Sequence, residues 1–181
     1  MAKVETIGGA VWDEGSITQL AWVIDDLDGV ERTLGSMFGV RRWTRLPDVY
    51  FGPDSCVYRG APANFTADIS LAYSGDLQLE LIAPGRGRSI YHEFLTDHGP
   101  GMHHVCIEPD DIDATVSFLE AEGLSVVQHG RLAGDEMRFV YLDGERSGAP
   151  VLEVAAVGPR IRALYDQIKI DSRDEETAGG R

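Results

Sequence analysis

The sequence predicts an α+β fold built from two copies of one unit, a strand followed by a helix and three more strands. One observation is that residues 17–39 and the stretch from Gly99 onward show the same order of events: an apolar strand, an Asp-rich helix start, and apolar residues at helical spacing. Another is that one shift of 85 residues places Gln19 on His104 and Leu34 on Leu119. An internal repeat of this kind indicates a duplicated module.

The first half begins with a strand over Ile17–Ile24, which is rich in apolar and β-branched residues. Acids in Asp25–Asp28 are typical of a helix N-terminus, and apolar residues at helical spacing carry the helix to Gly39. After the helix the pattern is extended again, with predicted segments at 40–46, 55–59, 64–73 and 77–83.

The second half begins with a Gly/Pro turn and a strand within Gly99–Glu108, and Pro109–Asp113 then caps a helix. Its later extended segments are 124–130, 137–142 and 150–156. The closing strands of the two halves also match, because a shift of 73 residues places 79–81 over 152–154.

Segments outside the repeat complete the expected organisation. Residues 89–98 read as a short helix on a Gly/Arg linker, and a helix starting at Pro159 carries one apolar stripe, so it should dock on the core. We therefore expect an N-terminal arm (1–15), a first module (16–84), a linker with a short helix (85–100), a second module (101–157), a C-terminal helix (158–170) and a disordered tail (171–181).

Composition excludes several classes of function. The net charge of −14 disfavours a nucleic-acid partner, because phosphate binding needs a basic surface. No apolar run approaches the roughly 18 residues of a membrane span, and residues 1–16 lack a signal-peptide pattern. The two cysteines lie far apart in the chain, which argues against a disulfide framework. We expect a cytoplasmic protein that acts on a small molecule.

The repeat also pairs polar residues inside apolar strands. Gln19 and His104 are equivalent in the first strand of each half, and Glu80 and Glu153 are equivalent in the last. A carboxylate between apolar strand residues is costly to bury unless it is paired or binds a metal. Two carboxylates, an imidazole and an amide oxygen together suit a divalent cation. Strand alternation predicts that His103 points to the opposite face from His104.

The segments 19–28 and 101–108, together with the duplication, resemble the vicinal oxygen chelate superfamily over about residues 17–156. That superfamily contains glyoxalase I, methylmalonyl-CoA epimerase, extradiol dioxygenases and antibiotic-sequestering proteins. The second-half motif is most similar to the epimerase. The resemblance implies two βαβββ modules that form a cupped mixed sheet, helices on its convex face, a homodimer, and a divalent metal (Co, Ni, Zn, Mn or Mg) in the cup. Its four metal ligands carry over to Gln19, Glu80, His104 and Glu153.

The resemblance implies a metal-dependent isomerase, epimerase or lyase that moves a proton next to a carbonyl through a metal-stabilised enolate or enediolate. Glu153 would be the catalytic base and Glu80 its partner, and an acyl-CoA or related acyl compound is favoured as substrate. The epimerase's second glutamate has no counterpart within residues 59–65, and Asp68 is a poor substitute. A protein that sequesters a small molecule is an alternative. An iron dioxygenase is a further one, although Gln19 makes it less suitable.

Three more residues are candidates for substrate binding. Arg86 and Arg88 follow the Glu80 strand and could hold an anionic group, although a solvated Gly/Arg turn has the same pattern. Cys106 shares the face of His104 by alternation, and we interpret it as a pocket wall and not as a nucleophile.

Overall fold

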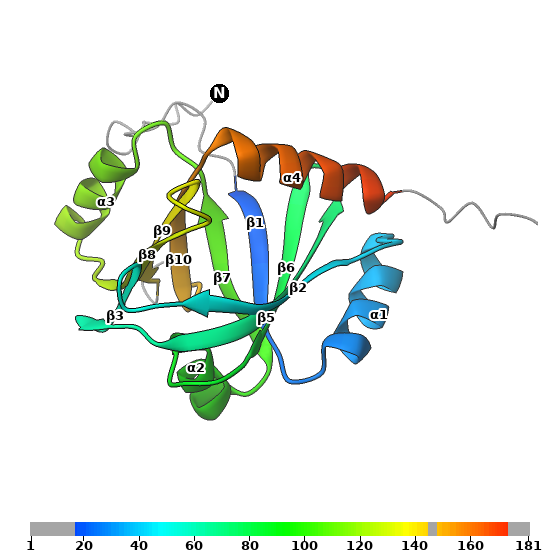
Figure 1. The fold of residues 1–181 in the computed structure, drawn as a ribbon, viewed down its shortest axis with the longest axis horizontal. Helices are drawn as coiled ribbons and strands as arrows, with labels where there is room; N and C mark the ends of the chain where they lie inside the picture. The colour runs from blue at the N-terminus through cyan, green and yellow to red at the C-terminus, as the bar shows by residue number, and fades with distance from the viewer. Residues whose placement is uncertain (1–16, 145–147, 174–181) are drawn as a thin grey trace, which may run out of the picture.

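The protein folds into one strongly curved mixed sheet with four helices packed on it (Figure 1). The computed structural model describes residues 17–144 and 148–173. Within these residues the sheet has ten strands in the order β2-β5-β6-β1-β7-β10-β9-β8-β3-β4. This curled, half-barrel arrangement confirms the predicted α+β fold class.

The first half supplies both the centre and one side of the sheet. Its elements are β1 (Ile17–Val23), α1 (Leu27–Phe38), β2 (Thr44–Phe51), β3 (Cys56–Tyr58), β4 (Ala61–Pro62), β5 (Phe65–Ser74) and β6 (Leu77–Pro84). Asp26 caps α1, because its side chain accepts a hydrogen bond from the amide of Gly29. Gly39 ends that helix in the left-handed conformation (φ 70°).

The second half repeats this order after a connecting helix. Its elements, with the two helices that flank it, are α2 (Ile90–His98), β7 (Gly101–Ile107), α3 (Ile112–Ala121), β8 (Val126–Leu132), β9 (Met137–Asp143), β10 (Val151–Val157) and α4 (Pro159–Asp171). Asp111 caps α3 through the amide of Ala114, which matches the cap that Asp26 makes on α1 one repeat earlier.

The two halves meet at the antiparallel pair β1 and β7. Each of these strands has the last strand of its own half as its other neighbour, and both of those pairings are parallel: β1 with β6, and β7 with β10. The arrangement is therefore symmetric about the β1–β7 seam. It brings the four strands that carry the predicted metal ligands side by side in the middle of the sheet.

The helices divide between the two faces of the sheet. On the outer face, α1 packs with Ile24 and Leu81, and α3 packs with Val140 and Leu142. On the inner face, α2 and α4 contribute buried apolar side chains to the core that fills the cup. The helices inside the repeated unit thus lie on the convex face as expected, whereas the two flanking helices close the concave side (Figure 1).

One segment of the first half, β3, pairs with the outermost strand of the second half, β8. After β2 the chain crosses to β8, where β3 pairs antiparallel with it and places Cys56 opposite Gly130. A Cβ atom on Gly130 would stand 2.9 Å from the carbonyl oxygen of Ser55 and 2.8 Å from the ring of Phe139. Only glycine permits this close approach without displacing a neighbour. The predicted segment 55–59 is therefore a strand of the first half that extends the sheet of the second.

Two boundaries differ from the sequence predictions. The segment predicted at 40–46 becomes β2 only at Thr44, because the amide of Val40 bonds to the carbonyl of Gly35 at the helix end. At the other end, α4 runs to Asp171 and Ser172 is buried, with its hydroxyl accepting a hydrogen bond from the amide of Tyr73. The expected tail thus has an ordered start.

The arm at 1–15 and the rest of the tail from 174 lie outside the described residues. In the parts that are described, no helix combines the length and the apolar character needed to cross a membrane.

Candidate metal centre

The strand register brings the four paired polar residues together on the concave face. Ala21 on β1 lies opposite Glu80 on one side and opposite His104 on the other. Cys106 on β7 lies opposite Gln19 and Glu153 in the same way. Because residues directly opposite each other in a sheet share a face, the side chains of all four point into the cup.

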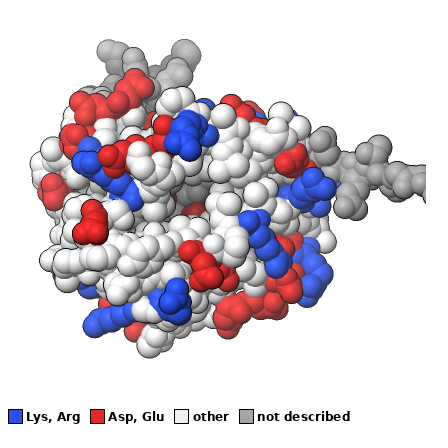
Figure 2. Space-filling view, in the orientation of Figure 1, with Lys and Arg blue, Asp and Glu red and all other residues white. Residues whose placement is uncertain are grey.

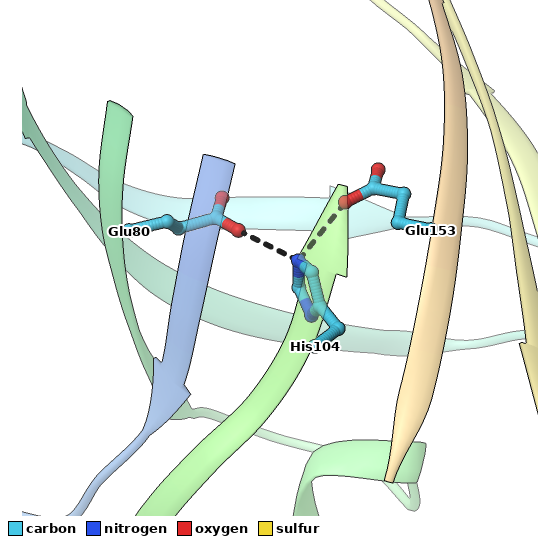
Figure 3. A group of neighbouring side chains, drawn as sticks. All are labelled: Glu80, His104 and Glu153. Atoms are coloured by element: carbon cyan, nitrogen blue, oxygen red, sulfur yellow. Dashed lines mark ion pairs between the residues drawn. The ribbon is translucent and has the colours of Figure 1, made fainter. Parts of the chain in front are cut away.

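The side chains converge on one atom, the Nε2 of His104. Glu153 Oε2 lies 2.9 Å from this nitrogen, Gln19 Oε1 3.2 Å and Glu80 Oε2 3.4 Å. Figure 3 shows the two carboxylates reaching toward the imidazole from opposite sides. The ligand atoms of the three ionisable residues all lie within 4.8 Å of one another. This spacing is compact enough for one ion to contact all of them.

Burial sets the electrostatics of this group. His104 is fully buried, Glu153 is 3% exposed and Glu80 is 8% exposed. Burial alone would lower the pKa of His104, but the carboxylates of Glu153 and Glu80 outweigh it and raise the pKa to about 9. Burial raises the pKa of Glu80, and the imidazole of His104 opposes that shift. Two buried carboxylates with one imidazole leave negative charge in the cup, and a divalent cation bound by carboxylate, amide and imidazole ligands would neutralise it.

His103 lies beside His104, and the prediction that it points to the opposite face was wrong. The pairing of β1 with β7 shifts register between Ala21, opposite His104, and Trp22, opposite Met102, so His103 is an extra residue in a β-bulge. Its Nδ1 lies 2.8 Å from the Nδ1 of His104, and its ring packs edge-on against Phe94. Alternation fails here because the bulge interrupts it.

Gln19 is oriented by a second chain of polar groups. Its amide nitrogen donates to Gln78 Oε1 at 2.6 Å, and the amide nitrogen of Gln78 donates to the hydroxyl of Tyr73 at 2.9 Å. These bonds use the nitrogen of the Gln19 amide, which leaves the carbonyl oxygen facing His104. A neutral oxygen ligand is thereby positioned without any added charge.

The group opens onto a cavity of about 340 Å³, which Gln19, Glu80 and Glu153 line. Figure 2 shows a hollow beneath α4 with a mostly uncharged rim. Four tyrosines also line the cavity, and sequence reasoning assigned none of them to the site. Two of them, Tyr91 on α2 and Tyr141 on β9, have hydroxyl oxygens 3.1 Å apart. Burial raises the pKa of both hydroxyls well above the usual range, so both keep their protons at neutral pH.

The predicted substrate-binding residues lie elsewhere. Arg88 forms an ion pair with Glu93 at 3.0 Å, and Arg86 bonds through its backbone amide to Thr66; neither is among the residues that line the cavity. Cys106 lies on the concave face beside Gln19 but is not a lining residue either. Burial raises the pKa of its thiol well above the usual range, so it is not activated as a nucleophile.

Asp68, considered above as a substitute for the second glutamate of the epimerase, does not line the cavity. Asp68 is exposed, on the opposite side of β5 from Ile69, and its carboxylate accepts a hydrogen bond from the amide of Asp48. Among the described residues, Glu80 and Glu153 are the carboxylates that line the cavity.

Comparison with known sequences agrees with this architecture. The family described as the Glyoxalase/Bleomycin resistance protein/Dioxygenase superfamily matches residues 18–141. The chain therefore belongs to this superfamily. This confirms the resemblance to the vicinal oxygen chelate superfamily that the sequence indicated.

Several proteins similar to this chain are methylmalonyl-CoA epimerases, all at low identity. The human mitochondrial methylmalonyl-CoA epimerase is 22% identical over 153 residues, covering 83% of this chain and 79% of that protein. Among solved structures, the Mycobacterium tuberculosis methylmalonyl-CoA epimerase superposes with a TM-score of 0.60 at 18% identity, covering 87% of this chain and 97% of the other. A Streptomyces coelicolor methylmalonyl-CoA epimerase bound to 2-nitronate-propionyl-CoA gives 0.56 at 18% identity, covering 78% and 96%. At these identities the structural likeness establishes the fold.

Proposed function

We propose that this protein is a divalent-metal-dependent isomerase, epimerase or lyase that moves a proton on the carbon next to a carbonyl group. The observation that carries the proposal is the convergence of Glu80, His104 and Glu153 within 4.8 Å at the edge of a cavity. An acyl-CoA or related acyl compound is the favoured substrate. This choice is supported by the names of the relatives and by the neighbour bound to an acyl-CoA analogue.

Gln19, Glu80, His104 and Glu153 would hold the cation. When bound, it would supply positive charge that stabilises the negative charge developing on the substrate's carbonyl oxygen. The side chains around the cavity would transfer the proton and orient the substrate.

The carboxylates can transfer the proton. Glu153 would take it from the carbon next to the carbonyl, and Glu80, on the other side of His104, would return a proton to that carbon. Return to the same carbon from the opposite face gives epimerisation, whereas return to a neighbouring atom gives isomerisation. No organic cofactor is needed for either outcome.

The tyrosine pair can orient the substrate. Tyr91 and Tyr141 carry two hydroxyl protons, and their mutual hydrogen bond uses one of them. The second proton has no acceptor among the described residues and is available to a carbonyl or carboxylate oxygen in the cavity. We assign these hydroxyls as hydrogen-bond donors to the substrate.

The first test is metal binding by the full-length protein. Stoichiometric divalent metal in protein purified without a tag, or a rise in melting temperature with added Co²⁺, Ni²⁺, Zn²⁺, Mn²⁺ or Mg²⁺, is expected, because a ligand that binds the folded state stabilises it. Protein that contains no metal and is not stabilised by any of the five cations would contradict the metal centre.

The second test is exchange of solvent deuterium into a panel of acyl-CoA compounds, followed by mass spectrometry. Glu153→Gln should lower the exchange rate about 10²- to 10⁴-fold, the usual contribution of a general base. The matched control is Glu120→Gln on the exposed face of α3, which should leave the rate unchanged. Wild-type exchange in the Glu153 variant would remove this residue as the base. Tight binding of a compound without exchange would favour the sequestering alternative.

The family resemblance also supports a homodimer. Sedimentation of the full-length protein should give about twice the mass of one chain.

A further inference from the structure

The cavity in front of the metal centre has two ends of different chemistry. One end is polar, with Gln19, Glu80, Glu153 and the two tyrosine hydroxyls. The rest of the lining is mostly apolar, and its two other hydroxyls, those of Tyr50 and Tyr165, already bond to Asn64 and Met137. The apolar side chains that matter here are Leu46, Val49, Ile69, Leu132, Met137 and Leu164. A ligand that fills the cavity must therefore combine an oxygen-bearing head with an apolar remainder.

The charged residues around the cavity further limit the ligands that it can hold. Of the described residues that line the cavity, Glu80 and Glu153 are the charged ones, and neither a lysine nor an arginine is among them. Arg162, on the helix that covers the cavity, is already paired with Glu108. A second anionic group on the ligand, away from the metal centre, would be desolvated without a cationic partner.

The size of the cavity leaves room for more than the head group. An apolar cavity of about 150 Å³ is enough to hold benzene, and this cavity measures about 340 Å³. The space is thus roughly that of a small chelating group together with a ring or a branched alkyl group. A methyl substituent alone would leave the apolar end largely unfilled.

The apolar walls are fixed by contacts at their ends. The covering helix α4 contributes Leu164 and lies across the sheet (Figure 1). At its start the amide of Arg160 donates to Glu136 at 3.0 Å, and near its end Lys169 pairs with Asp76 at 2.8 Å. The opposite wall is β2, which pairs with β5 on both sides of a register shift between Leu46 and Val49. Because both walls are held in place, their shape selects the ligand before binding.

We propose that the substrate of this centre carries an uncharged apolar substituent, about the size of a phenyl or branched alkyl group, next to its metal-binding oxygens. The proposal rests on the function proposed above, and it narrows the acyl substrate to one class. Substrates whose remaining substituent is a methyl group or a second carboxylate are then poor ligands.

The test uses hydroxamates as probes, because their two neighbouring oxygens bind divalent cations. Acetohydroxamate, phenylacetohydroxamate and succinic monohydroxamate are titrated calorimetrically into the cobalt-loaded protein. Phenylacetohydroxamate should bind about 10- to 100-fold more tightly than acetohydroxamate, as expected for burial of one aromatic side chain. Succinic monohydroxamate should bind most weakly. Equal affinities, or the reverse order, would overturn the proposal while leaving the metal centre intact.

A pair of variants ties the effect to the cavity. Val49→Phe fills the apolar end and should abolish the preference for phenylacetohydroxamate while keeping the affinity for acetohydroxamate. Val30→Phe makes the same change on α1, outside the cup, and should keep the preference. Thermal melts of both variants establish that they fold. A preference that survives Val49→Phe would overturn the proposal.

A metal-free measurement separates this inference from the proposed function. Ethylbenzene should raise the melting temperature of metal-free wild-type protein and of the Val30 variant, but not of the Val49 variant. If ethylbenzene behaves in this way and cobalt does not bind, the proposed function fails while the apolar ligand site stands. If cobalt binds and ethylbenzene has no effect, the apolar site fails.

Discussion

The two halves of the molecule place polar residues at equivalent positions but support them differently. In the first half, Gln19 is held by a chain of neutral amide and hydroxyl groups through Gln78. In the second half, His104 is held by the bulged His103 and carries a pKa raised to about 9. The two halves thus place Gln19 and His104 at equivalent positions, and the residue type at each position decides whether that ligand can carry a proton. We expect Gln19, the ligand of the first half, to be held in one orientation at any pH, and His104, the ligand of the second half, to change its protonation with pH.

The substitution with the largest expected effect gives the second half the ligand of the first, a glutamine in place of His104. His104→Gln should destabilise the metal-free protein by about 3–5 kcal/mol, because two buried carboxylates lose their cationic partner. Urea unfolding at pH 7 measures the change. An unchanged unfolding midpoint would show that the imidazole does not pair with the carboxylates.

The reverse exchange serves as the control. Gln19→His keeps the carboxylates paired and supplies a nitrogen ligand at the equivalent position. The variant should still bind cobalt, whereas the His104 variant should not.

The pH dependence of the metal-free protein sharpens the comparison. Since the pKa of His104 is about 9 in the folded protein and 6.5 is its ordinary value, the folded state binds this proton more tightly. The resulting stability is fully present below about pH 6.5 and is lost as the pH rises through 9, a change of about 3 kcal/mol. Urea unfolding at pH 6 and pH 9.5 tests this, and the His104→Gln variant should lack this step.

The supports of the two ligands can be compared directly. For His104 Nε2 to bind a cation, its Nδ1 must carry the proton and donate it to His103, 2.8 Å away. His103→Phe removes that acceptor and should weaken cobalt binding about 10- to 100-fold. Gln78→Met removes the support of Gln19, a neutral ligand, and should cost less than about tenfold. Competition with a chelating dye measures both; equal losses would contradict the assigned difference.

The contact between β3 of the first half and β8 of the second gives the smallest expected effect. Gly130→Ala places a methyl group against the carbonyl of Ser55 and the ring of Phe139, and should destabilise the protein by about 1–3 kcal/mol. Gly101→Ala makes the same change where no atom lies within 4 Å, and should stay within about 0.5 kcal/mol. Thermal unfolding compares the two. Equal melting temperatures would mean that the β3–β8 contact adjusts freely.

Sequence reasoning succeeded where one periodicity governed the structure. The caps of α1 and α3 and the order of helices and strands along each half follow from the repeat, as does the equivalence of Glu80 and Glu153. It failed at His103, because a bulge depends on how β7 pairs with β1 of the other half, which alternation within one strand cannot show.

The tyrosine pair was missed for a related reason. Tyr91 lies on the connecting helix, outside the repeat. Tyr141 pairs with Glu153 in the sheet, but Leu71 pairs with Glu80 in the same way, so no polar residue is repeated. Arg86 and Arg88 were predicted from proximity in sequence to Glu80, yet the turn after β6 carries them out of the cavity lining. Site residues that come from elements outside the repeat cannot be found from the repeat alone, and only the tertiary fold identifies them.

The crossing of β3 to β8 also constrains how the chain reaches this structure. The edge formed by β3 and β4 cannot complete its pairing before the second half has been synthesised, because β3 of the first half pairs with β8 of the second. The central β1–β7 pairing joins parts of the chain that are even further apart in sequence. Folds dominated by such distant pairings form slowly, in milliseconds to seconds, since loop closure precedes the contacts that reward it. We therefore expect refolding to be a slow, single event in which both halves acquire structure together, because the metal ligands come from both halves and meet only when β1 pairs with β7.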